Sequence, residues 1–306
     1  MADKTSNRRG FLKRSVAASA GAAAALSLEE KILLARTSAR PRTPTPRGAT
    51  MPTGKIGKVQ ITRLICGGNL ISGYAHSRNL IYVSDLMKHY FTDDKIVETF
   101  EICETSGINT VITTINPDTL RVLKRHWKNG GKLQWIAQMH TKTAEPLVEP
   151  KLAVENGAVG AVIQGAYAER MVRSAKGLDA IKTIVTFLKR KKLIAGVGGH
   201  ELNSPVTCEA QGVDPDFYFK TINTENFHCA TPDKTVAFMK TVTKPWIAYK
   251  VLAAGAVNPT KGFKYALGGG ADFMCVGMFD FQVKHDVQIV KGILARGVKR
   301  ARPWRA

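Results

Sequence analysis

The sequence predicts a single (β/α)8 TIM barrel, and two observations lead to this fold class. The chain has 306 residues, and setting aside a leader and a linker leaves about 250, the usual size of one such barrel. From residue 55 onward, short runs rich in β-branched and aromatic residues alternate with runs of helical spacing. This alternation predicts parallel strands joined by helical crossovers.

Eight short apolar runs predict the strands of the barrel in chain order. Each is bounded by polar or turn-forming residues, as buried strands are. They span residues 61–66, 108–113, 133–139, 158–164, 193–197, 216–222, 246–252 and 271–276. In a closed barrel the residues that follow these strands meet at one mouth, where the chemistry of this fold is found.

Eight helical runs alternate with these strands. The clearest is 178–192, in which Ile181, Ile184 and Leu188 share one face. Gly157 stands just past the end of another helix, as glycine often does. The predicted helices span residues 94–105, 118–127, 150–156, 178–192, 205–211, 233–242, 261–267 and 283–295.

An open doubly wound sheet is the alternative that the same alternation permits. Its dinucleotide-binding form carries a glycine-rich turn after its first strand, and residues 196–199 (GVGG) are the nearest match. A lone glycine-rich turn is a weak signal. Eight strands and eight helices in order favour the closed barrel, which we place at residues 55–297.

Residues 1–35 and 36–54 are predicted to be an export signal and a basic, proline-rich linker. The run 7–13 (NRRGFLK) is similar to the twin-arginine export consensus, and a weakly apolar, alanine-rich stretch follows it. A leader without an export function is the alternative. The signal predicts the twin-arginine export machinery as a partner and an exported protein that is periplasmic or envelope-associated.

The net charge of +21 is concentrated at the two ends of the chain. Residues 1–50 carry +7 and residues 291–306 carry +6; the last of these, 298–306, are predicted to be a basic tail. A specific nucleic-acid site needs a basic folded face with reader side chains, so we expect no such partner. Contact of the basic ends with an anionic envelope surface is the alternative. No run approaches the ~20 apolar residues of a transmembrane helix.

The five cysteines do not form a recognisable framework. They stand at positions 66, 103, 208, 229 and 275, and none are spaced as CxxC. An odd number without paired spacing predicts neither a zinc finger nor a disulfide scaffold. Cys66 and Cys275 lie inside apolar runs and are interpreted as small core residues.

Four residues near the predicted strand ends are candidates for proton transfer or catalysis. His140 and His200 follow the third and fifth strands, Tyr167 follows the fourth, and Lys250 lies in the seventh. Histidine and tyrosine serve as general acids and bases, and a buried lysine can form a Schiff base. Lys220, in the sixth strand, is a second lysine of this kind. The alternatives are solvated histidines, a tyrosine that caps the rim, and lysines that point outward.

The same mouth could hold a divalent metal ion or a nucleotide. His140, His200, Glu201 and Glu225 are the candidate metal ligands, because imidazole and carboxylate groups bind such ions. Glycines permit close backbone approach to a ligand, although each could equally be a plain turn. The candidate cofactor-binding residues are Gly67, Gly68, Asn69, Gly198, Gly199, Asn223 and Gly277.

Three stretches resemble aldo-keto reductases. Residues 58–68 (KVQITRLICGG) look like the opening strand of that family, and 104–109 (ETSGIN) resemble the entry to its second strand. Residues 178–198 resemble its fourth helix and fifth strand, and 244–282 look like a divergent exported branch. The resemblance implies an oxidoreductase that uses NADP or NAD to reduce a small carbonyl or sugar-like substrate.

The catalytic residues of that family do not transfer to this sequence. The family uses Asp, Tyr, Lys and His around the carbonyl group. In this chain the second strand ends in Thr113 and Thr114, the third in Met139 and His140, and the fourth in Gln164. The family's basic loop for the 2′-phosphate of the cofactor also has no match after the eighth strand.

Three functions therefore compete. The first is an aldo-keto reductase-like enzyme in the cell envelope, whose proton-transfer groups would be His140, His200 and Tyr167. The second is a metal-dependent sugar isomerase, epimerase or lyase on the same barrel. The third is a barrel that binds a small molecule without catalysis.

Overall fold

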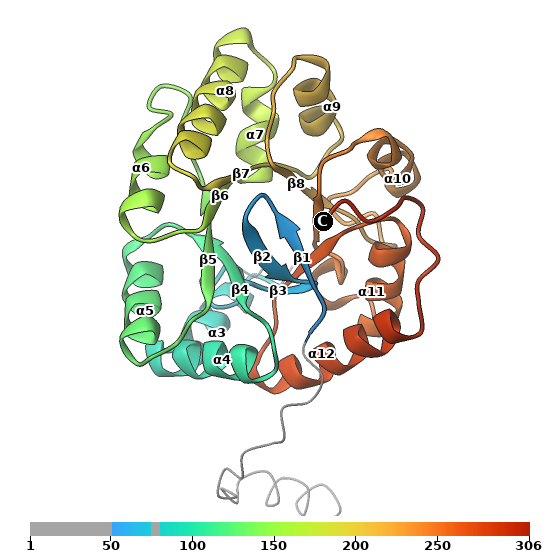
Figure 1. Cartoon of the computed structure of the whole chain (residues 1–306). Helices are drawn as coiled ribbons and strands as arrows, with labels where there is room; N and C mark the ends of the chain where they lie inside the picture. Colours follow the sequence, from blue (N-terminus) through green and yellow to red (C-terminus); the bar gives the residue numbers. More distant parts are fainter. Residues whose placement is uncertain (1–50, 75–79) are drawn as a thin grey trace, which may run out of the picture. The chain divides into compact units, whose positions relative to one another are not determined.

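The chain closes eight parallel strands into a barrel with helices around it (Figure 1). This computed structural model describes residues 51–74 and 80–306. The predicted (β/α)8 fold class is confirmed. The predicted export signal, 1–35, and residues 36–50 of the predicted linker lie outside the described residues.

The barrel strands neighbour one another in chain order, and the last pairs with the first to close the ring. Each overlaps one of the predicted runs. They are β3 (Leu64–Gly67), β4 (Thr110–Thr114), β5 (Gln134–Met139), β6 (Gly160–Ile163), β7 (Ile194–Gly199), β8 (Phe217–Thr221), β9 (Trp246–Tyr249) and β10 (Phe273–Val276).

The helices include all eight that the sequence predicts and two short ones that it does not, α3 in the long first loop and α7 directly after β6. They are α3 (Val83–Tyr90), α4 (Asp93–Thr105), α5 (Pro117–Lys128), α6 (Val148–Glu155), α7 (Gly165–Met171), α8 (Ala175–Arg190), α9 (Asn203–Ala210), α10 (Pro232–Thr241), α11 (Pro259–Gly268) and α12 (Asp280–Ala295), with the 3-10 turn η1 (Ala253–Gly255).

The predicted first strand is split in two, and its first part belongs to a hairpin outside the barrel. β1 (Thr53–Ile56) pairs antiparallel with β2 (Val59–Thr62), and Gly57 in the turn has φ 56°. Positive φ is what tight hairpin turns require. Ile56 and Ile61 pack against the side chains of the barrel interior. The hairpin therefore covers the end of the barrel where the strands begin (Figure 1), which we call the floor.

The core has two layers, because successive side chains along a strand point to opposite faces. One buried cluster fills the barrel, with Ile112, Ile136, Phe219, Ile247 and Tyr249 among its members. A larger cluster, which contains the alternate strand residues, lies between the strands and the helices. Inside and outside positions can therefore be assigned along each strand.

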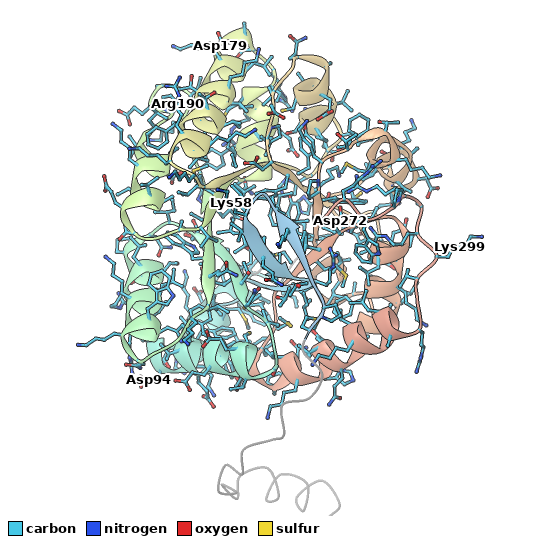
Figure 2. The ribbon with its side chains drawn as sticks, viewed as in Figure 1. Lys58, Asp94, Asp179, Arg190, Asp272 and Lys299 are labelled. Atoms are coloured by element: carbon cyan, nitrogen blue, oxygen red, sulfur yellow. The ribbon has the colours of Figure 1, made fainter. Side chains whose placement is uncertain are left out.

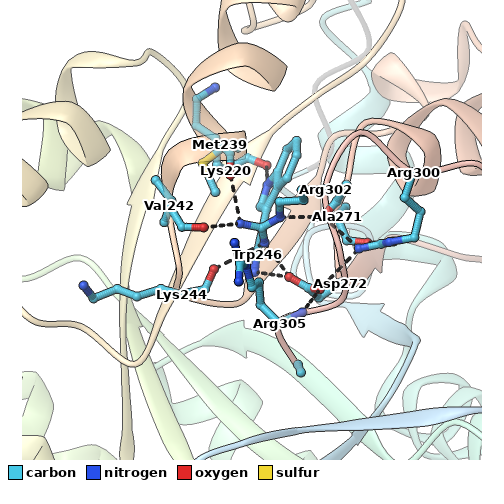
Figure 3. Close-up of polar contacts among 12 residues, drawn as sticks. Lys220, Met239, Val242, Lys244, Trp246, Ala271, Asp272, Arg300, Arg302 and Arg305 are labelled. Atoms are coloured by element: carbon cyan, nitrogen blue, oxygen red, sulfur yellow. Dashed lines mark hydrogen bonds and ion pairs between the residues drawn. The ribbon is translucent and has the colours of Figure 1, made fainter.

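Residues 298–306 pack against the floor (Figure 3). Arg302 is buried, and its guanidinium donates to the carbonyl oxygens of Gly270, Met239 and Val242 at 2.9–3.0 Å. Its remaining nitrogen donates to Asp272 Oδ2 at 2.5 Å. The positive charge of this segment is therefore partly neutralised inside the fold.

Asp272 is the centre of this floor cluster. It is 0% exposed, and its Oδ1 accepts the backbone N–H of Arg305 at 2.9 Å and the Arg300 guanidinium at 3.3 Å. Its Oδ2 accepts the backbone N–H of Trp246 at 2.9 Å, besides Arg302. Both oxygens are thus saturated by groups from separate segments of the chain (Figure 3).

Charged side chains otherwise lie mainly at the outer surface. Asp94, Asp179 and Lys299 lie at the outer edge of this view, whereas the buried Asp272 lies near the hairpin that covers the floor (Figure 2). No helix in the described part of the chain is long and apolar enough to cross a membrane.

Candidate functional site

Tyr249 brings a phenol group to the end of the barrel where the strands finish, which we call the mouth. It is the last residue of β9, and its ring stacks on Phe219 inside the barrel at a centroid distance of 4.0 Å. Its hydroxyl is buried and has no hydrogen-bond partner among the described residues. Burial raises its pKa well above the usual value, so the hydroxyl stays protonated at neutral pH. An unpaired buried polar group is costly, and in the described residues this hydroxyl is one of five such atoms, the others belonging to His126, Asn203 and Arg300.

His200 and Glu169 form a pair beside this hydroxyl. His200 Nδ1 lies 3.4 Å from Glu169 Oε1, and the His200 ring centroid lies 5.5 Å from that of Tyr249. Glu169, on α7, also accepts the backbone N–H groups of His200 and, at 2.8 Å, Glu201. Burial would raise the pKa of Glu169, but these hydrogen bonds outweigh it and lower the pKa. The carboxylate therefore fixes the position of the His200 ring.

Gly165, the first residue of α7, makes room for both groups. A Cβ atom at this position would lie 2.6 Å from Tyr249 Oη and 2.8 Å from His200 Nδ1. The hydroxyl and the imidazole thus approach the same point from different strands. Any side chain at this position would collide with the hydroxyl or the imidazole, so glycine is required for the two groups to come together.

Lys250 follows Tyr249 and adopts a left-handed backbone conformation, with φ 56°. Its Nζ lies 5.1 Å from the ring centroid of Phe227 in the loop after β8. Burial lowers the pKa of Lys250 to about 8. In the same loop His228 lies against the His200 ring, with centroids 5.3 Å apart. The predicted residues His200 and Lys250 therefore share this side of the mouth.

The other two predicted catalytic residues form a separate contact. The His140 ring stacks on Tyr167 with centroids 5.2 Å apart and planes 15° apart. Burial lowers the pKa of His140. The Arg170 guanidinium also lies over the Tyr167 ring, with its Cζ 4.3 Å from the centroid. These partly exposed side chains form a flat surface of their own, and the groups that surround the Tyr249 hydroxyl are instead His200 and Gly165.

The predicted metal ligands are not brought together. Among residues 51–74 and 80–306, no three His, Cys, Asp or Glu side chains form a group that could hold a metal ion. Glu201 and Glu225 are exposed, and the carboxylate that pairs with His200 is Glu169. Both glutamates follow barrel strands as predicted, but the loops turn them outward.

The predicted cofactor-binding glycines are explained by contacts within the protein. A Cβ at Gly67 would lie 2.8 Å from the backbone nitrogen of Gly277, and one at Gly68 would overlap the side chain of Thr113. A Cβ at Gly198 would overlap the Ile163 carbonyl oxygen. Close packing of strand ends therefore accounts for glycine at these positions.

The remaining predicted cofactor-binding residues do not outline a nucleotide site either. At Gly199 a Cβ would lie 3.1 Å from the Glu201 carbonyl oxygen, and at Gly277 3.2 Å from Leu70 Cγ. Asn69 is exposed. The buried side chain of Asn223 donates to the Phe227 carbonyl oxygen at 2.8 Å, and its oxygen accepts the backbone N–H groups of the same loop.

Asp280 occupies the place after β10 where the aldo-keto reductase resemblance predicts a basic loop. Its carboxylate accepts the Tyr90 hydroxyl at 2.6 Å and pairs with Lys95 at 3.2 Å. A carboxylate in the first turn of α12 disfavours a phosphate there. Asp280 therefore does not supply the basic contact that the 2′-phosphate of NADP would need after this strand.

Lys220, the second lysine considered for Schiff-base chemistry, is fully occupied. It is 1% exposed, and its Nζ donates to the carbonyl oxygens of His200 and Thr221 at 2.6 and 3.1 Å and to Thr221 Oγ1 at 3.0 Å. Three acceptors around one nitrogen leave no lone pair for a carbonyl carbon. Lys220 instead fixes the backbone at the end of β7.

Sequence reasoning missed Tyr249 and Glu169. Tyr249 stands in an apolar run and looks like a core residue, yet alternation from Ile247 would have placed it inside the barrel. Glu169 lies on a short helix that the sequence did not reveal. The signal for this helix was Gln164, whose side chain accepts the backbone N–H of Ala166 at 2.8 Å and so caps it.

No known family model matches the chain, and no curated protein sequence is similar to it. Solved structures match in fold. Gox0644 without ligand is 9% identical with a TM-score of 0.54, over 79% of this chain and 93% of that one. A Gox0644 variant in complex with NADPH is 9% identical with a TM-score of 0.52, over 77% and 85% of the two chains.

A truncated 3-deoxy-D-arabino-heptulosonate 7-phosphate synthase from Thermotoga maritima is also similar in fold. It is 13% identical with a TM-score of 0.52, over 82% of this chain and 95% of that one. At such identities the likeness shows the fold alone. This chain therefore shares the (β/α)8 architecture of these TIM-barrel proteins.

Proposed function

We propose that this chain is an enzyme that transfers a proton at the carbonyl group of a small or sugar-like molecule bound at the mouth. The observation that carries this proposal is the buried Tyr249 hydroxyl, which lacks a partner in the described protein and lies beside the His200–Glu169 pair. A substrate oxygen would supply the missing hydrogen bond.

The roles of the three residues follow from their surroundings. Tyr249 stays protonated, because burial raises its pKa, and it donates its proton or hydrogen bond to the substrate oxygen. Glu169 holds the imidazole of His200 in place. His200 accepts or supplies a second proton at the same point, where Gly165 leaves space. An orienting carboxylate behind a histidine is a recurring acid–base arrangement.

Reduction with NADP or NAD is the specific reaction that the aldo-keto reductase resemblance implies, and the NADPH complex of Gox0644 supports it. The nicotinamide would supply a hydride. The residues predicted to bind it do not fit, because the glycines are packed and Asp280 stands where a phosphate is expected. We therefore assign no step to this cofactor.

A proton-transfer reaction without redox change, such as isomerisation, epimerisation or elimination on a sugar, is the second candidate. The mouth has acid–base groups, whereas the glycines predicted to bind a nicotinamide cofactor are occupied by packing within the protein. This difference favours the reaction without redox change. A non-catalytic barrel that only binds its ligand is the third candidate, and it would show no turnover in either of the assays below.

Two assays test the proposal on the full chain. NADPH and NADH oxidation with a panel of small aldehydes, ketones and aldoses measures reduction. Exchange of carbon-bound protons of the same compounds in D2O, followed by NMR, measures proton transfer without redox change. We expect Tyr249→Phe to lower the rate of the active assay by a factor of about 10²–10⁴, as loss of a general acid does.

Tyr218→Phe is the matched control, because Tyr218 is another buried tyrosine and its hydroxyl donates to Glu209 at 2.6 Å outside the barrel. It should retain activity. Equal rates in wild type and Tyr249→Phe would overturn the assignment of the proton donor. Calorimetric titration of NADP(H) and NAD(H) then decides between the two reactions, because reduction requires binding and proton exchange does not.

Export by the twin-arginine route is a further part of the proposal, supported by the run 7–13. Replacing Arg8 and Arg9 by Lys should leave the protein inside the producing cell. Unchanged export of the double variant to the periplasm or envelope would contradict it.

A further inference from the structure

The loops after β8 and β9 contain most of the left-handed backbone outside glycine. Positive φ occurs at Asn226, His228, Lys250, Ala253 and Ala254 in these two loops. In the described ranges Lys192 is the remaining residue of this kind. Residues with side chains disfavour this conformation, and it gathers at functional sites where the surroundings hold it in place. The surrounding structure therefore holds the backbone of the loops after β8 and β9 in an unfavourable conformation.

Lys250 is the residue of this group that carries a nucleophilic amine. It follows Tyr249 directly, and its chain runs beside the ring of Phe227. The side chain remains partly exposed, so solutes can reach it. Burial lowers its pKa to about 8, and the neutral amine is correspondingly more abundant at neutral pH than for a solvated lysine.

The contrast with Lys220 shows that burial alone does not make a lysine a nucleophile in this barrel. Lys220 is more deeply buried, and three oxygen atoms surround its nitrogen. Lys250 instead stands directly after β9 at the mouth, where its side chain is partly exposed and its Nζ lies 5.1 Å from the Phe227 ring centroid. The two lysines thus differ in accessibility, and Lys250 is the one that a solute at the mouth can reach.

We propose that Lys250 forms an imine with the aldehyde or ketone group of the substrate. This inference rests on the proposed function, because proton transfer by Tyr249 and His200 completes the reaction. The substrate class is therefore a carbonyl compound small enough for the mouth, such as an open-chain sugar or an oxo acid.

The step balances without a further reactant. The neutral Nζ of Lys250 adds to the carbonyl carbon, and one of its protons passes to the carbonyl oxygen. An acid, Tyr249 or His200, protonates the resulting hydroxyl, which leaves as water. The iminium then returns its N–H proton to that base. While it is still protonated, the C=N bond of the iminium makes the neighbouring C–H more acidic, so isomerisation, elimination or C–C cleavage can follow without a nicotinamide.

Reductive trapping tests the proposal. The full chain is incubated separately with glycolaldehyde, D-glyceraldehyde, dihydroxyacetone and pyruvate, each with sodium cyanoborohydride, and examined by intact mass and peptide mapping. At least one probe should give a single adduct per chain, on Lys250, at least tenfold faster than on other lysines. Lys250→Met should lose this adduct, and Lys264→Met, which removes an exposed lysine of α11, should retain it.

The wild-type peptide map decides the question even if a variant fails to fold. Absence of an adduct with all four probes, or equal labelling of Lys250 and the exposed lysines, would overturn the imine. Loss of activity in Tyr249→Phe without a Lys250 adduct would reject the imine and keep the proposed function. A Lys250 adduct together with full activity of Tyr249→Phe would reject the assigned proton donor instead.

Discussion

At the floor of the barrel, one buried carboxylate is saturated with hydrogen bonds, whereas at the mouth a buried hydroxyl has no partner in the described protein. Asp272 accepts from Arg300, Arg302 and two backbone N–H groups. Tyr249 stacks on Phe219 and leaves its hydroxyl unpaired. The polar contacts of the barrel thus stabilise the floor, whereas an unpaired hydroxyl remains at the mouth, the end where TIM barrels generally carry their chemistry.

One buried polar atom at the floor, Arg300 Nε, is not hydrogen-bonded in this way within the described chain. Arg300 Nε is buried without a partner in the described ranges, although the same guanidinium donates to Ala271 at 2.8 Å and lies over the Trp304 ring at 3.4 Å. Burial lowers the pKa of Arg300 to about 10. The floor holds three arginines, Arg63, Arg300 and Arg302, around a single carboxylate, so its stability depends on that carboxylate.

The largest effect is therefore expected at Asp272. Asp272→Ala removes the acceptor of two buried guanidinium groups, and breaking a buried ion pair in this way costs about 3–5 kcal/mol. The free energy of unfolding, measured by urea titration, should fall by this amount. Arg302→Met, which removes the partner instead, should also destabilise the protein. A loss below about 1 kcal/mol, as for a surface pair, would show that the floor cluster is not cooperative.

The next effect concerns the cost of burying Lys250 at the mouth. Its folded pKa of about 8 lies below the unfolded value, so the unfolded state binds more protons between pH 8 and about 10.5. The penalty is fully present below pH 8 and disappears as the pH rises to about 10.5. Lys250→Met should therefore be more stable than wild type at pH 7, and this difference should shrink with pH. If the difference in unfolding free energy between Lys250→Met and wild type did not change with pH, the lowered pKa of Lys250 would be contradicted.

A smaller effect separates the two buried tyrosines. Tyr218→Phe loses its hydrogen bond to Glu209 and should lower the free energy of unfolding by about 1 kcal/mol. Tyr249→Phe removes a hydroxyl that has no partner in the described structure, so stability should stay unchanged or increase. Thermal and urea unfolding of both variants measures this. Equal losses would show that Tyr249 is structural rather than a proton donor.

The smallest effect is expected outside both ends. Arg121 pairs with Asp93 at 2.7 Å on the outer surface. Because both side chains are solvated, Asp93→Ala should change the free energy of unfolding by less than about 1 kcal/mol. A larger change, measured in the same urea titration, would mean that surface pairs contribute as much as the floor and would remove the contrast between the two.

Part of the candidate site could be predicted from the sequence. His200 was expected just past the fifth strand and Lys250 within the seventh; in the structure His200 follows β7 and Lys250 follows β9, because strand order fixes which residues meet at one end. The predicted metal ligands are not gathered among the described residues, because Glu201 and Glu225 are exposed and no spacing motif in the sequence fixed their direction. The predicted cofactor glycines were indistinguishable in sequence from glycines required by packing.

The amino-acid sequence by itself determined the (β/α)8 fold. Eight apolar strands that alternate with eight amphipathic helices commonly fold into a closed parallel barrel. It also located the mouth. The tertiary structure decided which groups meet: Glu169 lies beside His200, the Tyr249 hydroxyl is unpaired among the described residues, and Arg300 and Arg302 bind at the floor rather than in a free basic tail. The physical reason is that hydrogen-bond partners and burial depend on residues far apart in the chain, which local patterns do not record.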